Sequence, residues 1–253
     1  MIIAEIGSNH RGSFELASKY VDLLVASEVD CITFQVREPE FYHGIYKSLR
    51  LNFEELCDLK KKVKAGNKKF GLALCDLRDG VYPEPDFIKV LSKDLDNLEF
   101  LRMLVLKFPN VEFHLSTGMG DIDTISDALD LLRQFVSPEK TRIIHTCVSN
   151  SIEDTNLKAI LSLKKEFGNI VSYGSHSSNL NVIYASCAYE PIDYYFYVKH
   201  DGEPWTNENN HPDDLHAIPI ELVDVFCNNI RDILYSLGTG EKTKSENKIK
   251  GQI

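Results

Sequence analysis

The stretch Met1-Ile2-Ile3-Ala4-Glu5-Ile6-Gly7-Ser8-Asn9-His10-Arg11-Gly12 joins an apolar run to a cluster of polar residues. The apolar run predicts a short buried strand, and the loop after it brings an acid, an amide, an imidazole and an arginine together. A rigid strand that ends in convergent polar groups is typical of the edge of an active site. The same combination of apolar run and polar loop recurs further along the chain.

The pattern of strand, polar loop and helix continues to the C-terminal region. Apolar runs predict eight strands, at residues 2–6, 31–36, 69–74, 87–91, 111–115, 142–145, 170–173 and 194–198. Apolar spacing of three and four predicts helices between them, at residues 14–27, 53–64, 95–107, 122–135, 154–167, 179–189 and 220–237. This order is what a single α/β (β/α)8 TIM barrel requires. The linker between the third and fourth strands is short and holds Pro83 and Pro85, so its helix should be stunted.

A doubly wound open sheet is the alternative fold. It would normally carry a glycine-rich phosphate turn after the first strand, and GSNHRG does not match GxGxxG. We expect the barrel to occupy residues 1–238 and to be followed by a polar tail over residues 239–253.

The charge and the cysteine content of the chain bear on its binding partners and on its cellular compartment. The formal charge of -10 argues against a nucleic-acid or anionic-membrane surface, because both need clustered Lys and Arg. The six cysteines form no CxxC pair, and neither a signal peptide nor a membrane-spanning run is evident. These features predict a cytoplasmic protein with free thiols.

Catalytic groups of such barrels lie at the C-terminal ends of the strands, so the residues there are the candidates. The ends of strands four and five carry Lys89, Ser92 and the turn of residues 116–118, which supply a cation, hydroxyls and backbone N–H groups for a phosphate or carboxylate. Ser92 and Ser116 could instead be helix caps.

His176 and His200 follow neighbouring strands, and two imidazoles with oxygen ligands suit a divalent metal such as Mn²⁺, Mg²⁺ or Zn²⁺. Either histidine alone would more often be structural.

Taken in order, these segments resemble the sialic acid synthase family of phosphoenolpyruvate-dependent nonulosonate synthases. The matching segments are IIAEIGSNHRG (2–12), TFQ (33–35), FIKVLSKDLDN (87–97), STGM (116–119), IHTC (144–147), YGSHSSN (173–179), VKH (198–200) and NHPDDLHA (210–217). The resemblance implies that the enol carbon of phosphoenolpyruvate attacks the aldehyde of an open-chain amino sugar, after which water adds and phosphate leaves.

The resemblance also implies roles for individual residues. His176 and His200 would bind the metal, with Mn²⁺ or Mg²⁺ as the expected ion, and Asp94 would handle the water or its proton beside Glu5 and Lys89. The substrate-binding set would be Asn9, His10, Gln35, Ser92, Ser116, Ser175, Lys199, Asp213 and Asp214. The substrates would be phosphoenolpyruvate and an amino sugar, with no nucleic acid and no membrane as partner.

Five departures from the family pattern bear on this interpretation. Thr33 stands where the family has a phosphate-binding lysine, and Asp94 is one methylene shorter than the family's glutamate. Gly174-Ser175-His176 stands where the family has SDH, and Val198 replaces an acid before the KH pair. The family's C-terminal antifreeze-like domain has no counterpart in this sequence. We therefore expect that a separate antifreeze-like lid protein or the 201–216 loop covers the site, or that the substrate differs. A homodimer is the expected assembly if no separate lid protein binds.

Three functions remain open from the sequence. The first is the metal-dependent synthase just described. The second is an aldolase or lyase that acts on a keto-sugar acid without phosphoenolpyruvate, which the loss of a cation at Thr33 favours. The third is a catalytically weakened partner subunit, although retention of Glu5, Lys89 and His176 argues against it.

Overall fold

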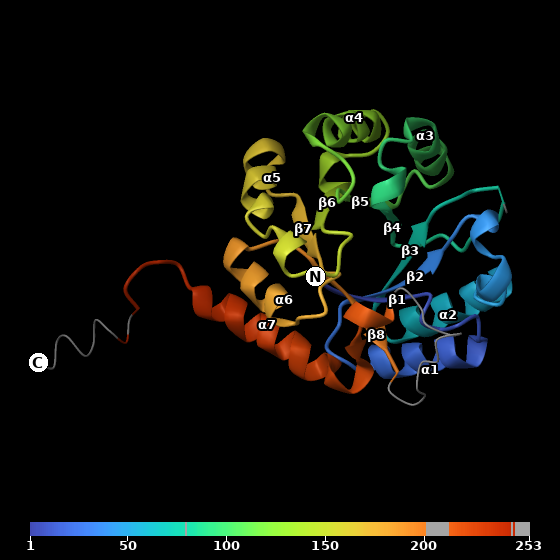
Figure 1. Ribbon diagram of the computed structural model, residues 1–253, viewed down its shortest axis with the longest axis horizontal. Helices are drawn as coiled ribbons and strands as arrows, with labels where there is room; N and C mark the ends of the chain where they lie inside the picture. The colour runs from blue at the N-terminus through green and yellow to red at the C-terminus, as the bar shows by residue number, and fades with distance from the viewer. Residues whose placement is uncertain (79, 201–212, 244, 246–253) are drawn as a thin grey trace, which may run out of the picture.

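The computed structural model describes residues 1–78, 80–200, 213–243 and 245. Within these residues the strands run in the order β1 (Ile2–Gly7), β2 (Cys31–Val36), β3 (Lys69–Leu74), β4 (Phe87–Val90), β5 (Glu112–Ser116), β6 (Thr141–Thr146), β7 (Val171–Gly174), β8 (Tyr194–Lys199) and β9 (Ile218–Pro219). Each of β1 to β8 pairs in parallel with the next, and β8 pairs with β1. The sheet therefore closes into a barrel (Figure 1), and the short β9 pairs with the end of β8.

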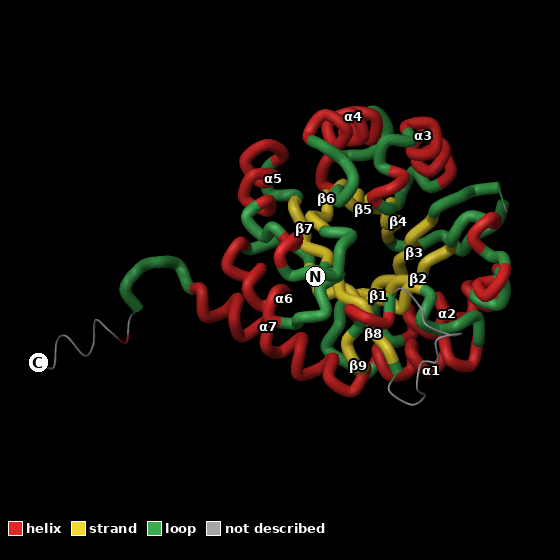
Figure 2. The backbone as a smooth tube through the Cα atoms, in the orientation of Figure 1, coloured by secondary structure: helices red, strands yellow, loops and turns green. Residues whose placement is uncertain are grey.

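The helices form a ring outside the barrel (Figure 2). They are α1 (Phe14–Val25), α2 (Phe53–Ala65), α3 (Leu98–Lys107), α4 (Ile122–Arg133), α5 (Ala159–Phe167), α6 (Asn181–Ser186) and α7 (Val223–Leu237). Short 3-10 segments lie at Pro39–Phe41, Gly44–Tyr46, Ser92–Asp94, Pro138–Lys140, Glu153–Thr155, Cys187–Tyr189, Asp214–His216 and Ile220–Leu222. The (β/α)8 prediction is confirmed. The described residues between β3 and β4 hold no helix, as the two prolines suggested.

Side-chain alternation along the strands separates two hydrophobic layers. Outward-facing residues pack against the helices, and this outer core includes Phe34, Phe70, Phe113 and Phe196. The inward-facing apolar layer is small and consists of Ile3, Cys31, Phe87, Ile144 and Tyr195. The ring of Phe87 fills the space at Gly71, where a Cβ would lie 2.2 Å from it. The lower barrel is therefore plugged, and any ligand must enter from the C-terminal ends of the strands.

Local sequence signals explain where the first helices begin. Ser13 caps α1 by accepting a hydrogen bond from the Leu16 N–H. Asn52 and Glu55 form a reciprocal capping box at the start of α2. In the part of the chain that the structure describes, no helix is long and apolar enough to span a bilayer.

Candidate functional site

The loop after β1 is held by its own polar groups. Gly7 ends the strand with φ +57°, a conformation that L side chains rarely adopt. The Asn9 side-chain amide donates to the Val198 carbonyl at 2.8 Å, and the Gly12 N–H donates to His10 Nδ1 at 3.0 Å. Asn9 and His10 are both 1% exposed. These two predicted substrate-binding residues therefore anchor the loop to β8 and to itself.

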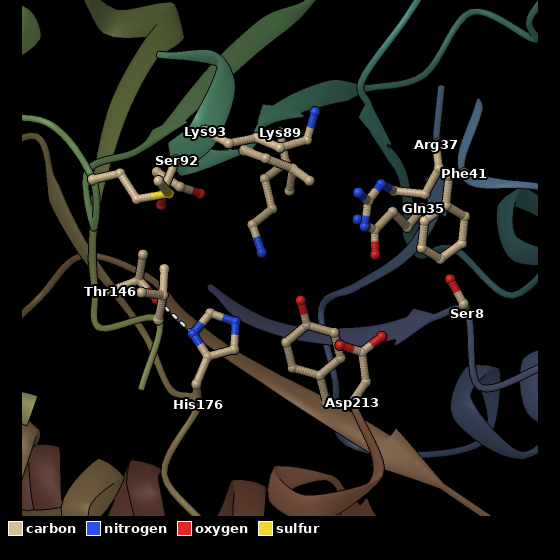
Figure 3. A pocket seen from close by; sticks show the side chains of 15 residues that line it. Ser8, Gln35, Arg37, Phe41, Lys89, Ser92, Lys93, Thr146, His176 and Asp213 are labelled. Atoms are coloured by element: carbon tan, nitrogen blue, oxygen red, sulfur yellow. Dashed lines mark hydrogen bonds between the residues drawn. The ribbon is translucent and has the colours of Figure 1, made fainter. Parts of the chain in front are cut away.

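A cavity of about 240 Å³ opens at the C-terminal end of the barrel. Six of the predicted site residues line it: Gln35, Lys89, Ser92, Ser116, His176 and Asp213. Other polar and aromatic lining residues were not predicted: Ser8, Arg37, Phe41, Lys93, Thr146 and Tyr197. Figure 3 shows Lys89 and Arg37 pointing into the same space, with His176 and Asp213 on the opposite side.

Glu5 and Lys89 form an ion pair inside the barrel below the cavity. Lys89 Nζ lies 2.6 Å from both carboxylate oxygens of Glu5, and both side chains are almost fully buried. The rings of Tyr195 and Tyr197 flank the ammonium, with centroids 5.4 and 5.6 Å from Nζ. Burial, followed by the charge of Glu5, raises the pKa of Tyr197 well above its usual value, so its hydroxyl stays protonated. The pair brings together residues that are 84 positions apart in the sequence.

Contacts at Nδ1 orient the imidazole ring of His176. Its Nδ1 lies 2.7 Å from the Cys147 carbonyl and 2.9 Å from Thr146 Oγ1. A carbonyl can only accept, so Nδ1 carries the proton and Nε2 keeps its lone pair. Burial, followed by the charge of Lys89, lowers the pKa of His176. The neutral ring also packs edge to face with His216, with centroids 4.9 Å apart.

Asp94 lies in the 3-10 turn directly after β4, beside the cavity-lining Lys93. Its Oδ1 accepts from Lys93 Nζ at 2.9 Å, and its Oδ2 is buried with no hydrogen-bond partner among the described residues. Burial raises the pKa of this carboxyl.

Two serine side chains line the cavity. In the turn after β5 the Gly118 N–H donates to Ser92 Oγ at 3.1 Å. Ser116 Oγ is also buried and is bonded by no described residue. Hydroxyls and a perturbed carboxyl therefore lie next to the cations.

The remaining predicted residues lie away from the cavity or outside the described side chains. Ser175 Oγ accepts from the Ser177 N–H at 3.3 Å, and Lys199 ends β8 without lining the cavity. The side chain of Asp214 lies outside the described residues. The His200 N–H donates to the Tyr20 hydroxyl of α1 at 2.6 Å, and the two rings meet edge to face at 6.3 Å.

The alternation of β8 explains why His200 and His176 do not meet. Tyr195 and Tyr197 face the barrel interior, whereas Phe196 and Val198 belong to the outer core. Because side chains alternate, His200 continues the outward set and reaches α1. The predicted convergence of two histidines is therefore absent from the described structure, and Tyr197 occupies the inward position.

The residues supply one oriented metal ligand. His176 presents Nε2 to the cavity in the way that a carbonyl-bound histidine ligand does. Among residues 1–78, 80–200, 213–243 and 245, however, no group of three or more His, Cys, Asp or Glu side chains is placed to hold a metal ion. The described side chains as placed therefore do not complete a metal site.

The fold and the cavity can be compared with known proteins. The model of the NeuB family matches residues 20–242. The chain belongs to the NeuB family. The expectation of a sialic acid synthase-like enzyme is thereby confirmed.

Relatives of this NeuB-family chain include several named synthases. It is 25% identical to N,N'-diacetyllegionaminic acid synthase of Campylobacter jejuni over 281 residues, which covers 99% of this chain and 81% of the relative. An uncharacterized protein of Methanocaldococcus jannaschii is 30% identical over 95% of this chain and 73% of its own length. The solved N-acetylneuraminic acid synthetase of Leptospira borgpetersenii superposes with a TM-score of 0.85 at 22% identity, covering 99% of this chain and 90% of that one. This last likeness shows the fold alone.

Proposed function

We propose that this NeuB-family enzyme condenses phosphoenolpyruvate with the aldehyde of an open-chain N-acyl amino sugar, giving a nonulosonate-type keto-sugar acid and inorganic phosphate. The proposal rests on one observation: the two sides of the cavity differ in the charge of the residues that line them. Arg37, Lys89 and Lys93 line one side, while Asp213 and the neutral His176 line the other (Figure 3). A polyanion suits the first side, and a hydroxyl-rich sugar suits the second.

Different residues of the site would take part in different steps of the reaction. In the reaction the enol carbon forms a bond to the aldehyde carbon, and the aldehyde oxygen gains a proton. Water then adds to the neighbouring carbon, and phosphate leaves from it. Lys89, Ser92 and Ser116 would hold the enol phosphate, and Asp94 would accept the proton of the water. Burial raises the pKa of this carboxyl, which makes it a stronger base toward the proton of the water.

A divalent metal, Mn²⁺ or Mg²⁺, belongs to the proposal through His176, whose Nε2 faces the cavity. We also propose a cytoplasmic reaction, because the six cysteines are all free.

The test incubates the protein, with Mn²⁺ or Mg²⁺, with phosphoenolpyruvate and a panel of N-acylated hexosamines, and follows phosphate release. Ser116→Ala removes a cavity hydroxyl that no described residue bonds, so it should slow release without lowering stability. The matched control is Ser236→Ala, at an exposed hydroxyl of α7. No release with any sugar, together with no thermal shift from phosphoenolpyruvate, would contradict the proposal.

An aldolase that cleaves keto-sugar acids is the second candidate. It is favoured by the neutral Thr33, which lies opposite Glu5 in the pairing of β1 with β2, and by Lys89, whose charge Glu5 already balances. Pyruvate release from a nonulosonate, without any phosphate release in the synthetic direction, would favour this second candidate.

A further inference from the structure

Arg37 is a cavity residue to which neither the sequence analysis nor the comparisons assign a role. It directly follows β2, whose inward positions are Thr33 and Gln35, and Arg37 continues this alternation. Gln35 and Arg37 both line the cavity. The Arg37 backbone N–H donates to the Tyr42 hydroxyl at 2.9 Å, which fixes the main chain where the strand ends.

The guanidinium of Arg37 is held in one orientation. It lies over the ring of Phe41, 4.2 Å from the centroid, and its Nε and Nη2 donate to the two oxygens of Glu38 at 3.0 and 3.2 Å. These hydrogen bonds lower the pKa of Glu38 to about 2 against the opposing effect of burial, so the pair is ionised. A guanidinium has five N–H donors, and Glu38 takes two of them. No described residue accepts the others.

The other two cations of the cavity are more fully engaged. Both oxygens of Glu5 lie 2.6 Å from Lys89 Nζ, so the charge of Lys89 is balanced inside the barrel. Lys93 Nζ lies 2.9 Å from Asp94 and 3.5 Å from Glu38. Arg37 therefore offers the largest set of uncommitted, preoriented donors to an anion that enters the cavity.

We propose that Arg37 binds two oxygens of the anionic substrate, through its phosphate or its carboxylate, and thereby sets the position of that substrate. This inference rests on the proposed function for the identity of the anion. A planar fork of N–H groups matches the oxygens of either group, and stacking on Phe41 reduces the entropy lost on binding. Arg37 would then provide, from the end of β2, the cation that Thr33 does not.

The experiment measures phosphoenolpyruvate binding by calorimetry without sugar, in wild type and in Arg37→Met. Loss of charge-assisted hydrogen bonds should weaken binding by about 10- to 100-fold. Arg37→Lys should recover part of the affinity, since it restores the charge but not the fork. Parallel titrations with inorganic phosphate and with pyruvate identify the group that Arg37 holds, because only that ligand should lose affinity in Arg37→Met.

Glu38→Gln is the matched control, because it breaks the same ion pair from the other side. If Arg37 binds the substrate, Glu38→Gln should keep or increase the affinity, since it removes a competing anion. If Arg37 only holds Glu38, both variants should lower the melting temperature and weaken binding alike, which would overturn the inference.

The outcomes also separate this inference from the proposed function. Phosphate release by wild type with an unchanged KM for phosphoenolpyruvate in Arg37→Met would support the function and overturn the inference. Arg37-dependent binding without turnover of any sugar would support the inference and count against the function. A wild-type protein that binds no phosphoenolpyruvate would overturn the inference.

Discussion

The ion pair between Glu5 and Lys89 should make each residue depend strongly on the other for stability. At 2.6 Å and an effective dielectric constant of about 20, Coulomb's law gives an attraction of about 6 kcal/mol. Desolvation of two buried ions offsets most of this attraction, so the pair adds little net stability. Lys89→Met or Glu5→Gln alone removes the attraction but leaves one ion buried. Each single variant should therefore lower the free energy of unfolding by about 3–5 kcal/mol.

The double variant Glu5→Gln/Lys89→Met should cost no more than either single variant, because it leaves no buried charge. Urea unfolding followed by far-ultraviolet circular dichroism gives the four free energies, and the coupling between the sites should be about 3 kcal/mol or more. The exposed pair Lys61–Asp58 provides a control cycle in which no measurable coupling is expected. Single variants that each cost under about 1 kcal/mol, and that add in the double variant, would refute the buried-pair reasoning.

Two further predictions concern Asp94 and the histidines. Burial raises the pKa of Asp94, so its favourable contribution to stability is complete below the unfolded pKa of about 3.9 and is lost as pH rises through the folded pKa. Asp94→Asn should therefore increase the free energy of unfolding at pH 7, by a margin that shrinks toward pH 4. The same variant should slow phosphate release. A loss of stability at pH 7 would contradict the reasoning. Mn²⁺ uptake, measured by equilibrium dialysis, should fall in His176→Ala and stay unchanged in His200→Ala, whose ring lies against Tyr20. Loss of uptake in His200→Ala would show that this side chain turns into the cavity.

The fold could be predicted from the sequence because its elements have strong local signals. Strands β2 and β3 begin and end at the predicted residues, since buried parallel strands are continuous apolar runs. The predicted helix over residues 154–167 is shorter in the structure, where α5 begins at Ala159 after a 3-10 turn. Asn156 adopts φ +45° there, and this left-handed residue separates the turn from the helix.

The site was predictable only in part, because strand ends can be read from the sequence but side-chain direction cannot. Lys89 lies in a predicted strand, Ser92 and Ser116 directly follow predicted strands, and all three line the cavity, as expected. Lys93 directly follows Ser92 in the sequence, but nothing in the sequence distinguishes it from a solvent-exposed lysine. Asn9 was predicted to bind substrate, and the sequence could not show that its amide also anchors the loop through a long-range hydrogen bond to the Val198 carbonyl.

The direction of side chains on β8 decides which residues can do chemistry at this barrel mouth. A strand of period two cannot present both Tyr197 and His200 inward, because three positions separate them. The inward position of Tyr197 is fixed by its contacts with Lys89 and His176 and by its close approach to Gly7, where a Cβ would lie 3.0 Å from the ring. The same rule places Arg37 in the cavity, since it lies an even number of positions from Thr33 on β2. Alternation therefore connects the two unexpected features of the site: it directs His200 away from the cavity and brings the guanidinium of Arg37 into it.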